Sequence, residues 1–567
     1  MKLKYILYSV TIGAVLTGCN DSFLERAPQE IVDQTYWNTV QDLESYANAF
    51  YDILPGGVTN AGDTGADDQV PNSVNTYNWG MYTVPAENGS WSKSNWSNIR
   101  MINYFMTHYG TVTGSEDQIN RYVGEMRFFR ALEYFAKVRT FGDVPWLDRD
   151  LNVDSPELYG PRTPRNEVIQ HIIEDLDFAI QWLPEGRVSS ADNRLTQDVA
   201  LHLKARVCLY EGTYYKYHTE LGLQSESQAL LQQAVDASDQ LIESGRYDIY
   251  STGDYEHDYY NLFMLDDKSN LEEAVLYIDY AEPLRRHNAA RGGMESNAGF
   301  SKDFVDRILY ADGLPKALTS YPTGDETLAE ELANRDPRAR QMIMNDAFGL
   351  ETDPAYSPVG NDNNYIRQWC QTGYQNFKYV SQSQFNLGNT MQTYDGIAYR
   401  YAETLLINAE AKAELDIITQ ADLDRTINKL RDRVNMPHLT VEVGFTDPNW
   451  PAAFGDISPL LQEIRRERSI ELAGEGFRWD DICRWKAGEL LNNVMTYVGK
   501  KVSADSEQAQ QGLRSEQGYY IVYPNYTNPN LSFQSGMSRT WDDKLYLEPI
   551  PSGEIQRNPQ LTQNPGW

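Results

Sequence analysis

The sequence predicts a mainly α-helical protein in which helix pairs stack as a solenoid, interrupted by an irregular, loop-rich lobe. Two observations favour this fold class. Apolar residues recur at steps of three and four along extended segments, which is the spacing of a buried helix face. These segments follow one another in pairs, with Gly and Pro between them, and paired helices of this kind stack side by side.

The first half of the chain contains a first helix and then helices that come in pairs, of which 94–109 and 117–141 form one. In the first helix Leu43, Ala47 and Phe50 lie at steps of four and three. The stretch 55–95 is rich in Gly, Asn, Asp and aromatic residues, so we expect an ordered loop there. The expected helices of this half span residues 39–54, 94–109, 117–141, 164–183, 195–217 and 225–244.

The second half begins with a long break in the helical spacing. From residue 246 to about 392, Pro, Gly, Asn and Asp are frequent, and a stretch of this length suggests a functional elaboration rather than an idle loop. Helical spacing then returns, and a strand is expected at 544–550. The paired helices resemble tetratricopeptide repeats, although the strict repeat signature is absent. The expected helices of this half span residues 397–415, 421–434, 459–472 and 479–498.

The N-terminus has the layout of a secretory signal. Lys2 and Lys4 precede an apolar run, 6–16, that is too short to span a bilayer. The run ends in Leu-Thr-Gly before Cys19, which resembles a bacterial lipoprotein lipobox. We therefore expect a signal peptide at 1–18 and acyl chains on Cys19 that tether the mature protein to a membrane. An ordinary signal peptide with a chance Cys is the alternative.

Length and charge limit the classes of function. The 567 residues are enough for one large or two ordinary domains, and 41% of them are hydrophobic. We expect a helical region at 19–245 that carries a binding loop at 55–95, and a second region at 246–567 with an irregular lobe at 246–396 and C-terminal helices. The formal net charge of −32 disfavours nucleic acid, whose binding depends on Lys and Arg that neutralise phosphates.

Motifs that announce catalysis are absent from the sequence. There is no Gly-x-Ser-x-Gly elbow, no His-Glu-x-x-His zinc helix and no phosphate-binding Gly-rich loop. The prediction is accordingly a binding protein without metal or cofactor, and not an enzyme. Calcium is left open, because Asp and Asn runs such as Asn361 to Asn364 occur without the regular spacing of a calcium loop. Besides Cys19 three cysteines remain, Cys208, Cys370 and Cys483. We expect Cys208 and Cys483, which lie in helical patterns, to be small buried side chains, and a single disulfide is left open.

Six segments in order resemble the SusD/RagB family of outer-membrane nutrient-binding lipoproteins. The most specific is Ile464-Arg465-Arg466-Glu467-Arg468 with the residues that follow it to Arg484-Trp485, and the ending Asn564-Pro565-Gly566-Trp567 is similar to the family's terminal signature. Ser469 and Trp567 are small departures from the family pattern. The matching segments span residues 23–37, 125–145, 194–210, 401–411, 464–485 and 549–567.

The resemblance implies a fold, a location and a partner. Family members have a helical body of four tetratricopeptide-like pairs and a less regular ligand-binding lobe. They sit on the outer face of the outer membrane, cap a SusC-like TonB-dependent transporter and hand it oligosaccharides. Some members resemble peptide carriers, so a peptide or protein fragment is the alternative ligand. A surface glycan hydrolase and a purely structural surface protein are less favoured alternatives.

The ligand contacts of the family lie outside its shared motifs, so candidates come from the chemistry of sugars. A saccharide presents apolar C–H faces and many hydroxyls, and its site needs aromatic planes beside polar side chains. Two regions offer this combination, and Trp79→Ala is expected to abolish binding. For each aromatic, packing of a long loop on the helical body is the alternative. The candidates are Asn72, Tyr77, Trp79, Tyr82 and Trp91 in the first region and Tyr280, Arg285 and His287 in the second.

The charged residues of the strongest motif have a structural interpretation. They surround a predicted helix–turn–helix, where Arg forks can pair with carboxylates in fixed geometry and lock the angle between helices. Contact with a partner protein is the alternative, and no catalytic role is expected. These residues are Glu467, Arg468, Glu471, Glu475, Arg478, Asp481 and Arg484.

Overall fold

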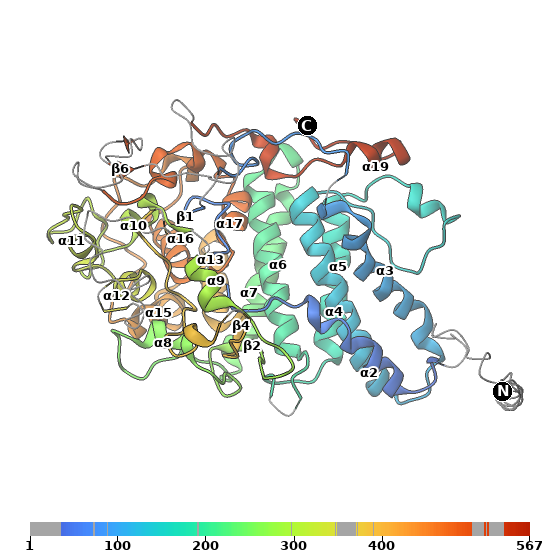
Figure 1. Ribbon diagram of the computed structural model, residues 1–567. Coiled ribbons are helices and arrows are strands. Elements are labelled where there is room, and N and C mark those ends of the chain that lie inside the picture. Colours follow the sequence, from blue (N-terminus) through green and yellow to red (C-terminus); the bar gives the residue numbers. More distant parts are fainter. Residues whose placement is uncertain are drawn as a thin grey trace, which may run out of the picture.

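In the computed structural model a row of long helices forms one side of the molecule and a lobe of short elements forms the other (Figure 1). The mainly helical fold predicted from the sequence is confirmed. Within the described part of the chain, no helix has both the length and the apolarity needed to cross a bilayer. The structure describes residues 36–59, 61–71, 74–87, 89–189, 192–295, 298–345, 347–348, 370, 372–388, 390–501, 515–516, 519–520 and 538–567.

The helical body is assembled from neighbours in sequence. Helix α4 packs along α5, α6 packs along α7, and α7 also contacts α13 (Figure 1). Helices α2 and α3 cover the outer side of α4. The helices of this body are α2 (Val40–Asn48), α3 (Lys93–His108), α4 (Glu116–Phe141), α5 (Arg165–Trp182), α6 (Gln197–Tyr217), α7 (Gln224–Glu243) and α13 (Tyr401–Glu414).

Local sequence sets the ends of these helices. Ser115 and Gln118 form a capping box at the start of α4, and Gly142 follows its last residue at φ +73°, where a residue with a Cβ would be strained. Within α4, Phe128 and Phe135 are fully or almost fully buried. Helix α4 therefore lies inside the body, with neighbours on more than one face.

The lobe between residues 246 and 396 consists of short helices and small two-stranded sheets. Strand β2 (Ala274–Ile278) pairs antiparallel with β4 (Gly396–Arg400), so the start and the end of the lobe are joined beside α13. Strand β1 (Gln69–Val70) pairs antiparallel with β3 (Gly299–Phe300), which brings the loop before α3 to the lobe. The other elements are α8 (Asp258–Met264), α9 (Ala289–Glu295), α10 (Lys302–Arg307), α11 (Leu328–Leu332) and α12 (Pro337–Met342), and β5 (Ser515–Glu516) pairs with β6 (Tyr519–Tyr520) further along.

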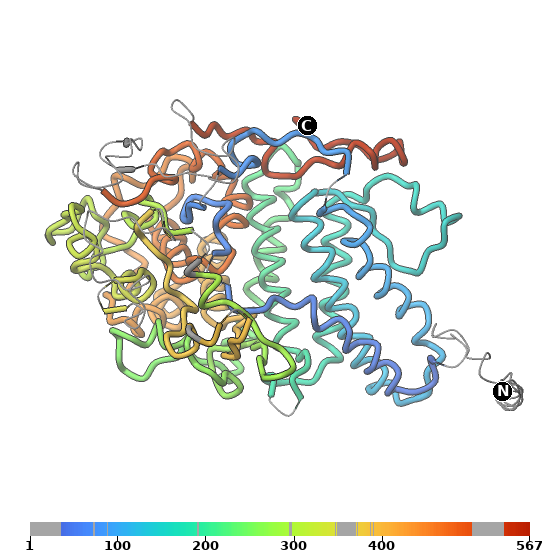
Figure 2. Tube along the Cα trace, viewed as in Figure 1, coloured from blue at the N-terminus to red at the C-terminus, as the bar shows by residue number. Residues whose placement is uncertain are grey.

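The C-terminal part returns to the helical body. Helices α14 (Gln420–Arg425), α15 (Ile427–Arg433), α16 (Pro459–Glu471) and α17 (Arg478–Arg484) pack near α13 and α6. The last segment, with α19 (Ser552–Arg557), runs across the ends of the long helices toward α3 (Figure 2). This crossing places the end of the chain beside residues from its first third.

Two sequence-based predictions were wrong in this part. The strand expected at 544–550 is a 3-10 turn, Asp543–Tyr546, because the Asp542 carboxylate accepts from the Lys544 N–H and starts a turn. The helix expected at 479–498 ends at Arg484, because Lys486 adopts φ +53° and the Ala487 N–H donates back to the Ile482 carbonyl.

Two further helices are shorter than expected. The helix expected at 421–434 divides into α14 and α15 at Thr426, whose backbone (φ −124°, ψ −92°) is not helical. The helix expected at 39–54 ends at Asn48 and continues only as a 3-10 turn, Tyr51–Ile53. In both cases the apolar spacing continues past the end of the helix, so the spacing alone did not indicate where the helix ends.

The charged residues of the helix–turn–helix α16–α17 are paired inside the protein. Arg484 binds Glu410 of α13 with both terminal nitrogens, at 2.6 and 2.7 Å, and the Trp485 indole N–H donates to the same carboxylate. Arg478 reaches Asp67 in the loop before β1 with two hydrogen bonds, at 2.7 and 2.9 Å. These pairs fix α17 against both α13 and that loop, as a scaffold would. Cys208, Cys370 and Cys483 are buried free thiols, so no disulfide joins them.

Candidate functional site

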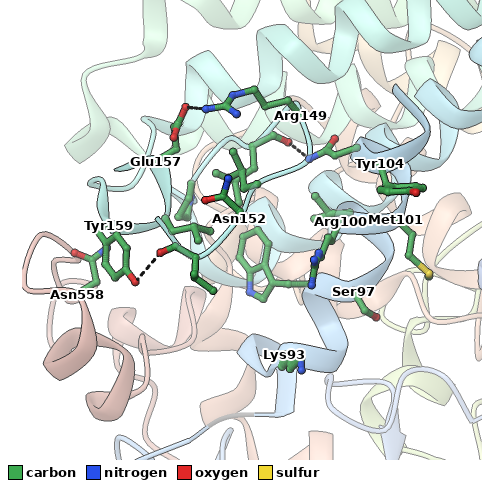
Figure 3. A pocket seen from close by; sticks show the side chains of 18 of the residues that line it. Lys93, Ser97, Arg100, Met101, Tyr104, Arg149, Asn152, Glu157, Tyr159 and Asn558 are labelled. Carbon is green, nitrogen blue, oxygen red and sulfur yellow. Dashed lines mark hydrogen bonds and ion pairs between the residues drawn. The ribbon is translucent and has the colours of Figure 1, made fainter. Parts of the chain in front are cut away.

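An open groove lies between α3, the loop 145–159 and the C-terminal segment that carries α19 (Figure 3). Its volume is about 970 Å³, within the range of sites that hold small organic ligands. In Figure 3, Lys93, Ser97, Arg100, Met101 and Tyr104 project from α3, while Asn152 and Tyr159 come from the loop. The three walls are therefore drawn from segments far apart in the sequence.

The loop wall is held at its base and from inside. Val144 and Thr163 exchange backbone hydrogen bonds of 3.3 and 3.1 Å, which closes the loop where it leaves α4 and where it enters α5. The Asn152 N–H donates to the Ser155 hydroxyl at 3.1 Å, and Arg149 forms an ion pair with Glu157. Compact loops of this kind frequently carry binding residues.

One face of α3 forms the opposite wall. Lys93, Trp96, Arg100 and Tyr104 are separated by three, four and four residues, so their side chains follow one stripe along the helix. All four line the groove. The stripe alternates a cation with an aromatic ring along its length.

The aromatic rings of the groove are partly open to solvent. Trp96 is half-buried and meets Trp91 edge-on, with 5.3 Å between ring centroids. Tyr46 and Tyr104 stack at 6.5 Å, and Tyr159 is 51% exposed. Flat rings that keep one accessible face are suited to the apolar C–H faces of sugar rings.

A buried polar atom in the wall has no partner within the described residues. Asn103 is 2% exposed and lines the groove, and its amide Nδ2 donates to the Leu147 carbonyl at 2.6 Å. That bond fixes which side-chain atom is the oxygen, and Oδ1 has no hydrogen-bond partner. A buried unsatisfied acceptor costs about 1–3 kcal/mol.

The carboxylates of the groove are engaged. Glu157 pairs with Arg149, and Glu554 pairs with Arg557. A backbone hydrogen bond of Glu157 and the Arg149 guanidinium lower the pKa of Glu157 below its ordinary value. Across the part of the chain that the structure describes, no group of three or more His, Cys, Asp or Glu side chains could hold a metal ion.

Of the predicted residues of the first region that the structure describes, only Trp91 lines this groove. Trp91 is 6% exposed and packs edge-on against Phe141, so it supports Trp96 from below. Trp79 is 7% exposed and packs against Tyr497, at 5.1 Å between centroids. The open ring expected of Trp79 is thus not found, because the loop folds its indole onto the 3-10 helix Val494–Tyr497.

Tyr77 and Tyr82 lie together at another place, beside the C-terminal residue. The Tyr77 ring stacks on Trp567 at 6.2 Å, and Tyr82 meets both rings edge-on. The Tyr77 hydroxyl donates to the Leu545 carbonyl at 2.9 Å. Both tyrosines are half-buried, and their contact with a ligand stays a prediction. Asn72 and Cys19 lie outside the described residues.

The second region is split between a buried cluster and a small cavity. The Tyr280 hydroxyl donates to the Gly56 carbonyl at 3.0 Å, and His287 Nε2 lies 2.9 Å from the Tyr394 carbonyl oxygen. Burial lowers the pKa of His287 to about 4, so this side chain is neutral at pH 7. Arg285 lies over the Tyr280 ring and lines a separate cavity of about 280 Å³. These three contacts also stay predictions.

The residues of the α3 stripe were missed from the sequence. The predicted helix at 94–109 contains Trp96, Arg100, Asn103 and Tyr104, but the predicted ligand-binding rings all belong to loop regions. The available signal was the recurrence of cations and aromatic residues at helical spacing on a helix with a weakly apolar face. That pattern alone did not reveal the second wall, which comes from other segments.

The protein thus combines a row of paired helices with an irregular lobe and an open groove lined by aromatic rings. The model of the SusD family matches residues 245–567, more than half of the chain, and a second family model, described as starch-binding and associating with the outer membrane, matches residues 22–209. The chain belongs to the SusD family, as the sequence motifs predicted.

Known relatives and solved structures agree with this assignment. The chain is 25% identical to SusD-like protein P2 of Formosa agariphila, with all of both chains covered, and 31% identical to a SusD-like protein of Bacteroides ovatus over 37% of this chain and 39% of that protein. Two SusD-like proteins of Bacteroides fragilis share the fold. One has a TM-score of 0.72 at 24% identity, covering 96% of this chain and 100% of the other. The second, described as carbohydrate binding, has a TM-score of 0.70 at 22% identity, covering 93% and 100%.

Proposed function

We propose that this protein is a surface lipoprotein that binds an oligosaccharide in the α3 groove and delivers it to a SusC-like TonB-dependent transporter of the outer membrane. Acyl chains on Cys19 hold it at the cell surface. The observation that carries the proposal is the stripe of open rings and polar groups on α3, facing a fixed loop across about 970 Å³. Saccharide sites combine these two kinds of group.

Membership of the family supports the class of ligand and the location. One SusD-like protein of known structure is described as carbohydrate binding, and another is described as laminarin binding, with a TM-score of 0.56 and 21% identity over 94% of this chain. The family model for residues 22–209 carries an outer-membrane association in its description. Transfer of the glycan to a transporter is our inference from family membership.

The carboxylates of the groove support binding rather than hydrolysis. A glycosidase needs one carboxylic acid with a raised pKa that can protonate the leaving oxygen. In this groove the pKa of Glu157 is lowered, and Glu554 forms an ion pair with Arg557. Neither carboxylate has the apolar surroundings of a general acid, so we assign the groove no catalytic step.

Replacement of the central ring tests the proposal. In Trp96→Ala the largest open ring of the α3 stripe is lost, and stacking on an aromatic ring contributes about 0.5–1.5 kcal/mol beyond the apolar area that it buries. We expect the affinity for the recognised oligosaccharide to fall about tenfold, measured by isothermal titration against a broad glycan panel. The fold is checked by circular dichroism, because Trp96 also packs against Trp91.

Trp182 provides the matched control. It is a half-buried tryptophan near the C-terminal end of α5 that packs against Phe178 and does not line the groove. Trp182→Ala removes the same side chain and is expected to leave affinity unchanged. Binding that is equally strong in wild type and Trp96→Ala would place the glycan elsewhere. A panel in which no glycan binds the wild type would remove the proposed function.

A further inference from the structure

Building on the proposed function, we infer that the oligosaccharide taken up by the α3 groove carries anionic groups, carboxylates or sulfates, on its sugar rings. The inference names a class of ligand for that same groove. It rests on two cations of the α3 stripe, Lys93 and Arg100, and on the way that the neighbouring carboxylates are already paired. A neutral glycan would leave both cations without a function in binding.

Lys93 and Arg100 are weakly engaged within the protein. No ion pair or hydrogen bond joins Lys93 to another of the described residues, and its side chain is exposed. The Arg100 side chain is 71% exposed, and its nearest carboxylate oxygen, Oδ1 of Asp150, lies 3.7 Å from Nε without a hydrogen bond. Both cations can turn toward a ligand at little cost.

The other charges of the groove largely neutralise one another. Arg149 forms an ion pair with Glu157. On the C-terminal side of the groove, Arg557 forms ion pairs with both Glu554 and Glu87. With Glu87, these residues carry two positive and three negative charges, a net charge of −1. The net attraction for an anion comes from the α3 wall.

The end of α3 adds to this attraction. Helix α3 has 16 residues, begins at Lys93 and has no acidic residue in its first turn. The N-terminus of a helix carries a partial positive charge that favours anions and that a first-turn Asp or Glu would offset. Here a lysine occupies the first position instead. An anionic group of the ligand that pairs with Lys93 would lie close to this end of the helix.

The spacing of the two cations fits a chain of sugars. Seven residues separate Lys93 from Arg100, which corresponds to about 10 Å along a helix with a rise of about 1.5 Å per residue. Trp96 lies between them on the same stripe. A sugar ring stacked on Trp96 would place its neighbours in the chain near the two cations. Arg100 can bind a carboxylate or sulfate with two parallel hydrogen bonds.

The net negative charge of the protein makes a local pair of cations necessary for binding an anionic glycan. With a formal net charge of −32, its long-range field repels anions. An acidic glycan is therefore captured only where cations are close to the ligand and shielded from that field.

Paired probes test the inference. An oligogalacturonate is compared with its methyl ester, and a sulfated galactan oligomer is compared with its desulfated form, so the two anionic groups are examined separately. We expect at least one acidic form to bind about tenfold more tightly than its neutral counterpart at low salt. The double variant Lys93→Gln and Arg100→Gln should remove that difference. Added salt should weaken the acidic form most, because screening acts on charge.

Arg340→Gln is the control, since Arg340 is a partly exposed arginine outside the groove that pairs with Glu256. It should leave the preference unchanged. Equal binding of acidic and neutral forms, with loss of both in Trp96→Ala, would overturn the inference and leave the proposed function standing. Failure of every acidic probe to bind, or an acidic preference that survives in the double variant, would also overturn it.

Discussion

Replacing Glu471 with Gln should destabilise the protein strongly, because this carboxylate lies at the centre of a buried charge cluster. Glu471 is fully buried at the end of α16. Its Oε1 accepts from Arg400 and Arg433, both at 2.6 Å, and its Oε2 accepts from Arg338 at 2.9 Å. Burial alone would raise the pKa of Glu471, but Arg433, Arg400 and Arg338 outweigh it and hold that pKa below its ordinary value.

The size of the loss follows from these contacts. A hydrogen bond to a charged group contributes about 1.5–3 kcal/mol, so three such bonds would give an upper limit near 9 kcal/mol. Each arginine keeps another carboxylate, however, since Arg400 and Arg433 both contact Glu273 and Arg338 contacts Asp336. We therefore expect Glu471→Gln to lower the free energy of unfolding by about 3–5 kcal/mol, the usual cost of breaking a buried ion pair.

Equilibrium urea unfolding at neutral pH, followed by tryptophan fluorescence, measures this change. Glu256→Gln is the control, because the side chains of Glu256 and Arg340 are 42% and 44% exposed and such pairs contribute about 0–1 kcal/mol. Glycan affinity of the folded variant should be unchanged, since Glu471 does not line the α3 groove. If Glu471→Gln costs no more than the control, the cluster does not stabilise the fold as its geometry implies.

Two further predictions concern Trp79 and Glu410. Trp79→Ala should lower the free energy of unfolding by about 3–5 kcal/mol, because the ring is buried against Tyr497. The same variant should leave glycan affinity unchanged. A variant of normal stability that no longer binds glycan would instead make Trp79 a ligand contact. Burial alone would raise the pKa of Glu410, but Arg484 and its neighbours outweigh it and lower that pKa from 4.5 to about 2. Because the folded value lies below the unfolded one, this stabilisation is fully present above pH 4.5 and is lost as the pH falls toward 2, by about 3 kcal/mol in total. Urea midpoints measured across that interval should fall less steeply in Glu410→Gln, and an identical slope in wild type and variant would contradict the assignment.

The helices of the body were predictable because their signals are local. The apolar spacing of α4, its capping box at Ser115 and the left-handed Gly142 are all properties of neighbouring residues. Helix ends were less predictable where a single backbone angle decides them. Lys486 at φ +53° ends α17 although nothing in its side chain disfavours a longer helix.

The motif of α16 and α17 shows where local information stops. The spacing of Glu467, Arg468, Glu471 and Arg484 indicated a network of ion pairs around a helix–turn–helix. It did not indicate that Arg484 binds Glu410 on α13, because that pairing depends on which helix packs beside α17. The partners of a buried charge are set by packing between elements.

The sequence by itself determined the family, the helical body and the kinds of side chain that a saccharide site would need. Only the tertiary structure decided which rings remain open. A tryptophan in a loop, Trp79, is folded into the core, while a tryptophan on a helix, Trp96, keeps a partly exposed face in the groove. The exposure of a residue depends on what packs over it. The segments that face α3 across the groove, the loop 145–159 and the segment that carries α19, are distant in the sequence, and no local pattern encodes how they are arranged.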